Sequence, residues 1–565
     1  MNVVVIVSDT FRIDHIAAYG IREPWSRVGK ETQPFISSPS LDKLVAQSAI
    51  FDRFYVSSYP TIPCRLDMFT GKYSFPVRGW EPLSSTDIIL SEVMDEYGYT
   101  SMLIFDTPPL ANDEFNFTRG FSGWEWVRGQ HRDRWITDPV SVTIPAKPYK
   151  ISNVKGLRPY LLNKTRRVYE HDWMCAKTLS TASDWLERNA SRDKFLLWID
   201  MWDPHEPFDA PKHDLQRYQD PEYSGDAVIY PRYGRHNCLS PDEINDIRAR
   251  YAAKVTLVDR WIGVFLDRLS TLGLDKNTIV IFTTDHGHLF AEHNLQGKPT
   301  GPLGHLYEVT TRVPLIIRHP HGIGAGTRIS SIAQHVDIMP TILDMVGLPI
   351  PETVTGKSLW GVIRGEVGDV RNVAVSGRHS RAVNILGVGL SGKNKAAATF
   401  DGWVGVDFVS EPITVTSKKW TLICPPQGSA SPELYDIEND PQQLVNLFES
   451  EPAVAAHLLD ELVAFLLENG ADENRIRAYD WRAIDVDLQN RKGLDPDTTV
   501  YSFVVDGQLY AFLSEQEAQE MLSLGPYDIA IQQLSLENLR KREGKSLICV
   551  GDQYYWAEDV MFGEL

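Results

Sequence analysis

The stretch VVVIVSD, residues 3–9, is a run of five β-branched apolar residues that ends in a serine and an aspartate. A continuous apolar run of this kind is typical of a strand buried on both faces of a parallel sheet. Four further runs have the same character, at residues 100–106, 194–203, 277–285 and 313–320. Helix-like segments separate the runs, among them 38–51 and the long amphipathic stretch 241–273. Strands that alternate with helices predict an α/β domain with a doubly wound, mostly parallel sheet.

Acidic, hydroxyl and imidazole side chains follow four of these predicted strands. They are Asp9 after the first run, Asp106 and Thr107 after the second, Asp203 and His205 after the third, and Asp285 and His286 after the fourth. In doubly wound sheets the ligand binds beyond the carboxyl ends of the strands. We therefore predict a site where these side chains converge.

Asp9, Asp285 and His286 supply two carboxylates and one imidazole, which is a partial shell for a divalent cation. A helix cap is the alternative role for Asp9. We expect one bound ion, and these ligand types leave Mn, Zn, Ca and Mg open as its identity.

The segment SSYPTIPCRLDMFTG, residues 57–71, contains three reactive side chains within five positions: Thr61, Cys64 and Arg65. A threonine hydroxyl is inert at its free pKa and needs a base or a metal to become a nucleophile. A small buried cysteine often has only a packing role. Taken by itself, the segment leaves the choice of nucleophile open.

The composition excludes several classes of function. The chain has 565 residues, 56 basic and 75 acidic, for a formal net charge of −19. This balance argues against a nucleic-acid-binding surface. We find neither a signal peptide nor an apolar run long enough to span a membrane. The five cysteines are scattered and odd in number, which favours reduced thiols and a cytoplasmic location.

The strand pattern changes after residue 370. Residues 374–380, 403–410, 413–426 and 432–440 resemble short antiparallel strands, and a helix is predicted at 452–468. We therefore expect a catalytic α/β domain at 1–370, an antiparallel subdomain at 371–470 and an α+β extension at 471–565. Two interpretations of the extension remain: it covers the site of a neighbouring subunit in a homo-oligomer, or it enlarges the second region.

Seven segments, in order, resemble the sulfatase branch of the alkaline phosphatase superfamily. They are residues 9–20, 38–58, 202–208, 283–287, 307–320, 334–351 and 433–447. The resemblance implies an alkaline-phosphatase-like fold and a metal-dependent ester hydrolase.

The resemblance also assigns a nucleophile. Sulfatases carry Cys-x-Pro-Ser/Ala-Arg followed by Thr-Gly, and their cysteine is converted to formylglycine. On that frame Thr61 takes the cysteine position and Cys64 the Ser/Ala position, while Arg65 falls on the arginine. Threonine cannot become formylglycine, so Thr61 is expected to coordinate the ion directly and to act as the nucleophile. Arg65 is expected to hold the nucleophile and the oxygens of the transferring group.

The remaining site residues are carried over in the same way. His205 is expected in the site as a donor to an oxygen or to the leaving group, and Asp203 either orients it or ligates a second metal. Lys298 and His305 are two candidates for a later active-site cation. Sulfatases usually have Lys and His where this chain has Asp106 and Pro108, and Thr107 is the hydroxyl there.

These residues favour a metal-dependent hydrolase of small anionic esters, with no nucleic-acid or membrane partner. Phosphodiesters or phosphonate monoesters are the favoured substrates, reacting through a covalent Thr61 intermediate. A sulfuric ester hydrolase is the first alternative. A phospho-group transferase and a non-catalytic binding protein are the others.

Overall fold

The computed structural model describes residues 1–21, 36–300, 303–378, 411–427, 430–481 and five short strands beyond residue 498. The chain divides into two compact units. The first comprises Met1–Cys424 and Pro432–Ile476, and the second comprises Pro425–Ser431 and Arg477–Leu565. The first unit thus includes most of both regions predicted before residue 470.

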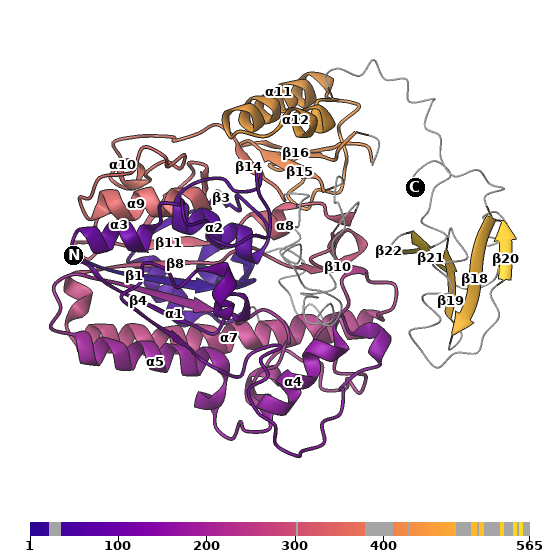
Figure 1. Cartoon of the computed structure of the whole chain (residues 1–565), viewed down its shortest axis with the longest axis horizontal. Helices are drawn as coiled ribbons and strands as arrows, with labels where there is room; N and C mark the ends of the chain where they lie inside the picture. The colour runs from indigo at the N-terminus through magenta and orange to yellow at the C-terminus, as the bar shows by residue number, and fades with distance from the viewer. Residues whose placement is uncertain are drawn as a thin grey trace. The chain divides into compact units, whose positions relative to one another are not determined.

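An eight-stranded sheet forms the centre of the described part of the first unit, and Figure 1 shows it between layers of helices. Its order is β12 (Thr327–Ile329), β2 (Ala49–Phe51), β11 (Leu315–Arg318), β8 (Thr278–Thr283), β1 (Asn2–Ser8), β6 (Phe195–Met201), β4 (Thr100–Phe105) and β5 (Gly123–Trp126). Neighbouring strands run parallel except β11, which is antiparallel to both β8 and β2. The predicted doubly wound, mostly parallel sheet is confirmed.

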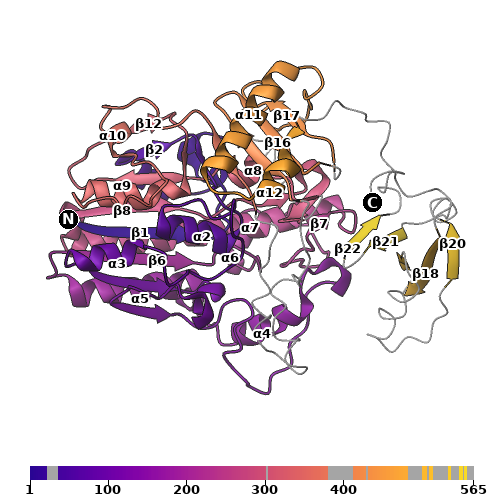
Figure 2. The same ribbon diagram turned by 45° about the horizontal axis from the view of Figure 1, so that its top comes forward.

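Side chains of β1 alternate between two apolar cores. Val4 and Ile6 pack with the core beneath α1 (Pro39–Ala46), α5 (Met174–Asn189) and α7 (Pro241–Thr271). Val3 and Val5 pack with the opposite core, which includes α2 (Thr61–Thr70), α3 (Leu90–Glu96) and α9 (Ile338–Met345). Figure 2 shows α5 and α9 on opposite sides of β1. Burial of both faces explains why the strand is apolar throughout.

One predicted helix is shorter than its sequence pattern indicated. The segment 38–51 forms α1 only as far as Ala46, and Ala49–Phe51 becomes β2. The Ala49–Phe51 strand pairs with β11 and β12, so sheet pairing prevails over the helical spacing of the segment.

The register of the paired strands fixes where along the sheet the predicted site lies. Val7 of β1 lies opposite Asp200 of β6 and Thr283 of β8. Asp9 and Asp285 each lie two residues beyond these paired positions, so both carboxylates emerge at the same edge of the sheet.

Shorter elements complete the first unit. They are α4 (Val154–Lys164), α6 (Lys212–Leu215), α8 (Glu308–Thr311), α10 (Trp360–Ile363), β3 (Phe54–Tyr55), β7 (Gly234–Arg235), β9 (Leu289–Phe290), β10 (Leu295–Gly297) and β13 (Ala333–Gln334).

An antiparallel sheet follows, as the change of pattern after residue 370 predicts. It has the order β14 (Ala374–Ser376), β15 (Ile413–Thr416), β16 (Trp420–Cys424) and β17 (Glu433–Asp436). Helices α11 (Pro452–Glu468) and α12 (Glu473–Tyr479) follow it. The strand predicted at 403–410 lies outside the described residues.

The second unit contains a separate sheet in the order β20 (Gln532–Ser535), β18 (Thr499–Val505), β19 (Gln508–Phe512), β21 (Ser546–Val550) and β22 (Gln553–Trp556). Among the described helices of the whole chain, none has the length and apolar character needed to cross a membrane.

Candidate functional site

Two neighbouring strands place the predicted metal ligands together. Asp9 follows β1, and Asp285 and His286 follow β8. One ligand atom from each lies within 4.8 Å of the other two, and all three side chains are fully buried. The arrangement gives two carboxylate oxygens and one imidazole nitrogen facing a common point.

The protonation pattern of His286 fits a metal ion. Its Nδ1 lies 2.9 Å from the carbonyl oxygen of Gly287 and donates to it, so Nε2 carries the lone pair. Nε2 is buried, lies 3.4 Å from Asp285 Oδ2, and has no hydrogen-bond partner among the described residues. Burial lowers the pKa of His286 to about 3, which keeps the ring neutral. A backbone carbonyl on one ring nitrogen and a free lone pair on the other is the usual state of a metal-binding histidine.

The carboxylates of the group also fit a cation. Burial, and then the adjacent carboxylate of Asp285, raise the pKa of Asp9 well above its ordinary value. A neighbouring divalent cation favours the ionised form of both groups. The donor set therefore matches a divalent ion of the kind predicted.

Thr10 holds both carboxylates from behind. Its amide donates to Asp285 Oδ1 at 2.9 Å and its hydroxyl donates to Asp9 Oδ1 at 2.8 Å. The residue has φ of 63°, a conformation that is costly for a β-branched side chain and persists where its surroundings enforce it. Thr10 thus takes part in the site without being a ligand in the predicted set.

Thr61 is the first residue of α2, and its side chain is 3% exposed. Within the residues that the structure describes, its hydroxyl makes no hydrogen bond. The partial positive charge of a helix N-terminus favours negative charge on a group at this position. The start of α2 is therefore a favourable place for a group that develops negative charge.

Cys64 lies one turn further along α2 and is fully buried. Its Sγ lies 3.4 Å from the carbonyl oxygen of Asp285. Burial raises the pKa of its thiol well above the ordinary value, and a thiol that stays protonated is a poor nucleophile. Cys64 has the surroundings of a packing residue.

Arg65 uses all five of its N–H bonds to join α2 to Asp200 and to the metal group, which comprises Asp9, Asp285 and His286. Nε and one N–H of Nη2 donate to Asp200 at 2.9 and 2.8 Å. The other N–H of Nη2 donates to Asp9 at 3.2 Å. Nη1 donates to the carbonyl oxygen of Thr61 at 3.1 Å and to Asp285 at 2.8 Å.

This geometry corrects the expected role of Arg65. A guanidinium has five donors, and each is occupied by protein, so none remains for an oxygen of the transferring group. Arg65 instead fixes the first turn of α2 against Asp9 and Asp285. Asp200, which sequence reasoning missed, completes the arrangement; an acidic residue inside the apolar strand 195–201 was the available signal.

Thr107 lies behind Arg65. Its hydroxyl donates to Asp200 Oδ1 at 2.5 Å, so it contacts a partner of Arg65. Its neighbour Asp106 accepts from Thr178 at 2.7 Å and from the amide of Trp202 at 2.6 Å. Asp106, at one of the two positions where sulfatases usually have Lys and His, and Thr107 thus belong to a buried supporting network.

Lys298, His205 and Glu206 form a second group. Lys298 Nζ lies 2.9 Å from His205 Nε2 and 3.1 Å from Glu206 Oε1. His205 Nδ1 lies 2.7 Å from the carbonyl oxygen of Glu206. Burial, and then the charge of Lys298, hold the pKa of His205 well below its ordinary value. The neutral ring therefore donates from Nδ1 and accepts from Lys298 at Nε2.

Lys298 itself stays charged. Burial alone would lower its pKa, but Glu206 and then Asp9 raise it above the ordinary value. A lysine ammonium has three donors, and two are used by His205 and Glu206. Lys298, rather than His205, is therefore the donor of the pair in this geometry. Glu206 is the second site residue that sequence reasoning missed.

Asp203 and His305 lie elsewhere than expected. Asp203 pairs with Lys254 at 2.7 Å and accepts from Gln130 at 3.1 Å, so it neither orients His205 nor joins the metal group. His305 Nδ1 lies 3.2 Å from Tyr307 Oη and 3.4 Å from Glu433 Oε1 of β17. Of the two predicted cations, Lys298 is the one that joins His205.

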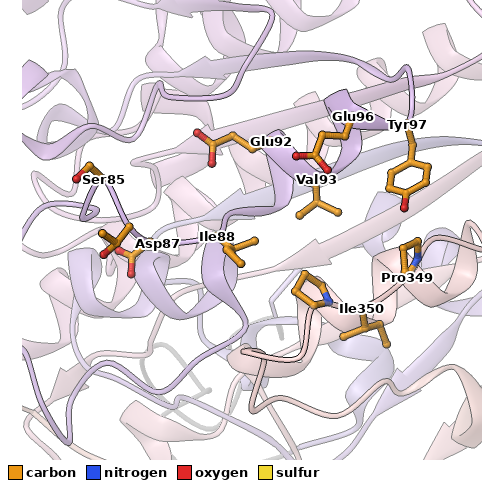
Figure 3. A pocket seen from close by; sticks show the side chains of 11 residues that line it. Ser85, Asp87, Ile88, Glu92, Val93, Glu96, Tyr97, Pro349 and Ile350 are labelled. Carbon is orange, nitrogen blue, oxygen red and sulfur yellow. The ribbon is translucent and has the colours of Figure 1, made fainter.

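A separate surface cavity of about 410 Å³ lies between α3 and residues 349–351 (Figure 3). Ile88, Glu92, Tyr97 and Ile350 are among its lining residues. None of the candidate site residues lines it.

Comparisons with known proteins show which proteins this chain resembles. The family model described as Sulfatase matches residues 1–348. The chain is 26% identical over 498 residues to arylsulfatase K of Bos taurus, which covers 82% of this chain and 81% of that protein. It is 25% identical over 487 residues to an arylsulfatase of Clostridium perfringens, which covers 80% and 90% respectively.

Solved structures show the same fold. The phosphonate monoester hydrolase of Agrobacterium radiobacter superposes with a TM-score of 0.63 at 20% identity, covering 83% of this chain and 96% of that one. The phosphonate monoester hydrolase of Silicibacter pomeroyi gives 0.61 at 22% identity, with the same coverage. Sulfatase-family enzymes use a divalent metal ion, which the group of Asp9, Asp285 and His286 fits. This chain therefore belongs to the sulfatase family, within the alkaline phosphatase superfamily, and is an ester hydrolase.

Proposed function

We propose that the protein hydrolyses small esters that carry a single negative charge, with Thr61 as the covalent nucleophile. Phosphonate monoesters and phosphodiesters are the favoured substrates. The observation that carries the proposal is the position of Thr61. Its hydroxyl makes no hydrogen bond within the described residues, and Arg65 joins its carbonyl oxygen to Asp9 and Asp285.

The chemistry divides into two displacements. A divalent ion, when bound, supplies activation of a hydroxyl and neutralisation of developing negative charge. In the first displacement the oxygen of Thr61 bonds to phosphorus, the ester bond breaks, and the alcohol leaves with a proton. In the second, water attacks phosphorus, breaks the bond to Thr61 and returns the proton to its hydroxyl.

Lys298 supplies the remaining donor. Its third N–H has no partner within the described residues, so it can donate to an oxygen of the transferring group or of the leaving alcohol. His205 holds the ammonium in place by accepting from it. Arg65 contributes by fixing geometry, since its donors are all used.

The charges around the metal group and Lys298 favour a substrate with a single negative charge. Arg65 faces three carboxylates, and Lys298 faces Glu206. A phosphate monoester carries nearly two charges at neutral pH, and its second charge finds no unmatched cation among the described side chains of the site. Phosphodiesters and phosphonate monoesters carry one.

A sulfate monoester is the second candidate, because relatives matched along most of this chain are named arylsulfatases. It also carries one charge. A formylglycine hydrate has a second hydroxyl on the same carbon that can expel sulfate, whereas Thr61 has only one oxygen. Release from Thr61 then needs attack of water at sulfur, which makes phosphorus esters the better match.

The test uses p-nitrophenyl esters with one common leaving group, assayed with Mn, Zn, Ca and Mg separately. We expect kcat/KM to be highest for the phosphonate monoester or the methyl phosphodiester, lower for the sulfate and lowest for the phosphate monoester. If kcat/KM for the aryl sulfate is well above the values for both singly charged phosphorus esters, the protein is instead a sulfuric ester hydrolase. Absence of turnover with every ester and every metal would overturn the proposed activity.

A further inference from the structure

We propose that Glu206 is a specificity-determining residue: its carboxylate cancels the charge of Lys298 and thereby sets the preference of the site for monoanionic over dianionic esters. This inference rests on the proposed function, since it concerns the substrate class of the same site. It starts from the position of Glu206 in the loop after β6, beside His205.

The Glu206 carboxylate is completely buried, and its two oxygens lie near Lys298 and two histidines. Oε1 lies 3.1 Å from Lys298 Nζ. Oε2 lies 3.4 Å from His205 Nδ1 and 3.7 Å from His288 Nδ1. Because a buried charge is tolerated only when it is paired, the Glu206 carboxylate and the Lys298 ammonium stabilise each other in their ionised forms.

The hydrogen-bond pattern assigns the charge of the group. His205 is a neutral ring whose Nδ1 donates to a backbone carbonyl and whose Nε2 accepts from Lys298. Lys298 contributes one positive charge and Glu206 one negative charge. The group therefore offers a substrate one N–H donor but no net positive charge.

The other described cations near the site are matched in the same manner. Arg65 pairs with Asp200, and Lys254 pairs with Asp203 at 2.7 Å. Arg378, which lies over the ring of Tyr59, pairs with Glu411 at 3.2 Å. Among these carboxylates, Glu206 is the one that pairs with the cation proposed to contact substrate. Removing its charge leaves the donor geometry in place and adds one unit of positive charge to the site.

The substitution Glu206→Gln tests this directly, because the amide keeps the size of the side chain and loses the charge. We expect the ratio of kcat/KM for p-nitrophenyl phosphate to kcat/KM for p-nitrophenyl phenylphosphonate to rise by a factor on the order of 10 or more, by Coulomb's law for one unpaired charge at close range. Glu206→Asp is the matched control: it keeps the charge, so the ratio stays within about threefold of wild type whatever its absolute rate. An unchanged ratio in Glu206→Gln overturns the proposal.

Two further measurements keep the test decisive. If Glu206→Gln does not fold, the wild-type enzyme is assayed between pH 5 and 8, where p-nitrophenyl phosphate gains its second charge and the phenylphosphonate does not titrate. We then expect the same ratio to fall as the dianion forms, and a ratio independent of pH contradicts the role of Glu206.

If the wild type hydrolyses no ester, the proposed function fails and Glu206 is judged by binding alone. Calorimetry with inorganic phosphate at pH 8 should show about tenfold or more tighter binding to Glu206→Gln than to wild type. Equal affinities overturn the inference about Glu206 independently of any activity.

Discussion

Two reactive side chains lie one turn apart near the start of α2, and their surroundings give them opposite chemical characters. Thr61 has a hydroxyl without a partner among the described residues, whereas Cys64 has a buried thiol with a raised pKa. We expect Thr61→Ala to lose ~3–5 orders of magnitude in kcat, the range seen when a covalent nucleophile is deleted. Cys64→Ala, the control on the same helix, should keep most of the activity. Comparable losses in both variants would contradict the assignment.

Asp200 carries a second prediction at the scale of single residues. It is the bidentate partner of Arg65, so Asp200→Asn weakens a buried ion pair and releases the guanidinium that positions Asp9 and Asp285. We expect a loss of about 3–5 kcal/mol in the free energy of unfolding. Thr107→Val removes one hydrogen bond to the same carboxylate and should cost only about 1 kcal/mol.

Urea unfolding measures the free energy of unfolding of both variants. Titration with the metal measures a second expected effect of Asp200→Asn, a lower metal affinity. Loss of a group that orients metal ligands typically weakens metal affinity by about 10–100-fold. An Asp200→Asn protein as stable as Thr107→Val, with wild-type metal affinity, would show that Arg65 does not depend on Asp200.

At the scale of elements, β1 and β8 together create the metal group, because their parallel register brings Asp9 and Asp285 to one edge. Metal binding to the folded state alone should raise stability by about 2.7 kcal/mol at a concentration 100 times Kd. We expect the melting temperature of the wild type to rise with metal and that of Asp285→Asn to stay unchanged. Asp106→Asn, at the end of β4, which β6 separates from β1, is the control and should respond like wild type. Equal melting points of wild type with and without metal would refute the site.

His335 links the end of β13 to the end of β8 and gives a pH prediction. Its Nε2 donates to the carbonyl oxygen of Thr284 at 2.8 Å, and its buried Nδ1 has no hydrogen-bond partner in the part of the chain that the structure describes. Burial lowers its pKa from 6.5 to about 4. Between these two values the unfolded chain binds a proton that the folded chain does not, so stability rises with pH there and is lost as pH falls from about 6.5 toward 4.

The difference between the two pKa values makes the full contribution of His335 to the free energy of unfolding roughly 3 kcal/mol. Urea unfolding of the metal-free protein at pH 7, 6, 5 and 4 measures it, with His335→Gln as the comparison. We expect the free energy of unfolding of the variant to change less steeply with pH, because one fewer histidine binds a proton on unfolding. Identical slopes in the two proteins would mean that the pKa of His335 is the same in the folded and the unfolded chain.

For the whole molecule, the sheet and the metal group were predictable from the sequence for one physical reason. A strand buried on both faces is apolar until it reaches the edge of the sheet, so the polar residues that end VVVIVSD and IVIFTTDH identify that edge. The resemblance to sulfatases then located Thr61 and Arg65 by their spacing. The strands, the helices and the residues at their ends could therefore be predicted from the hydrophobic pattern and from the order of the segments along the chain.

The partners of these residues were not predictable in the same way. Asp200 and Glu206 lie far from Arg65 and Lys298 in sequence, and only the fold shows which cation each carboxylate faces. The expectation that Asp203 orients His205 shows the opposite error, because residues close in sequence need not be partners. Asp203 is two residues from His205 but pairs with Lys254 of α7. Proximity along the chain is a weak guide here because Asp203 and His205 both lie beyond the end of β6, where no strand geometry fixes the direction of their side chains.

The most direct test of the account is the identity of the covalent intermediate. The protein is mixed with metal and a p-nitrophenyl phosphonate, quenched in acid within milliseconds to seconds, digested, and examined by peptide mass spectrometry. We predict a phosphonyl group on Thr61, absent from Thr61→Ala and present in Cys64→Ala, with Cys64 recovered as an unmodified thiol. An adduct on any other residue, or formylglycine at Cys64, would contradict the central claim.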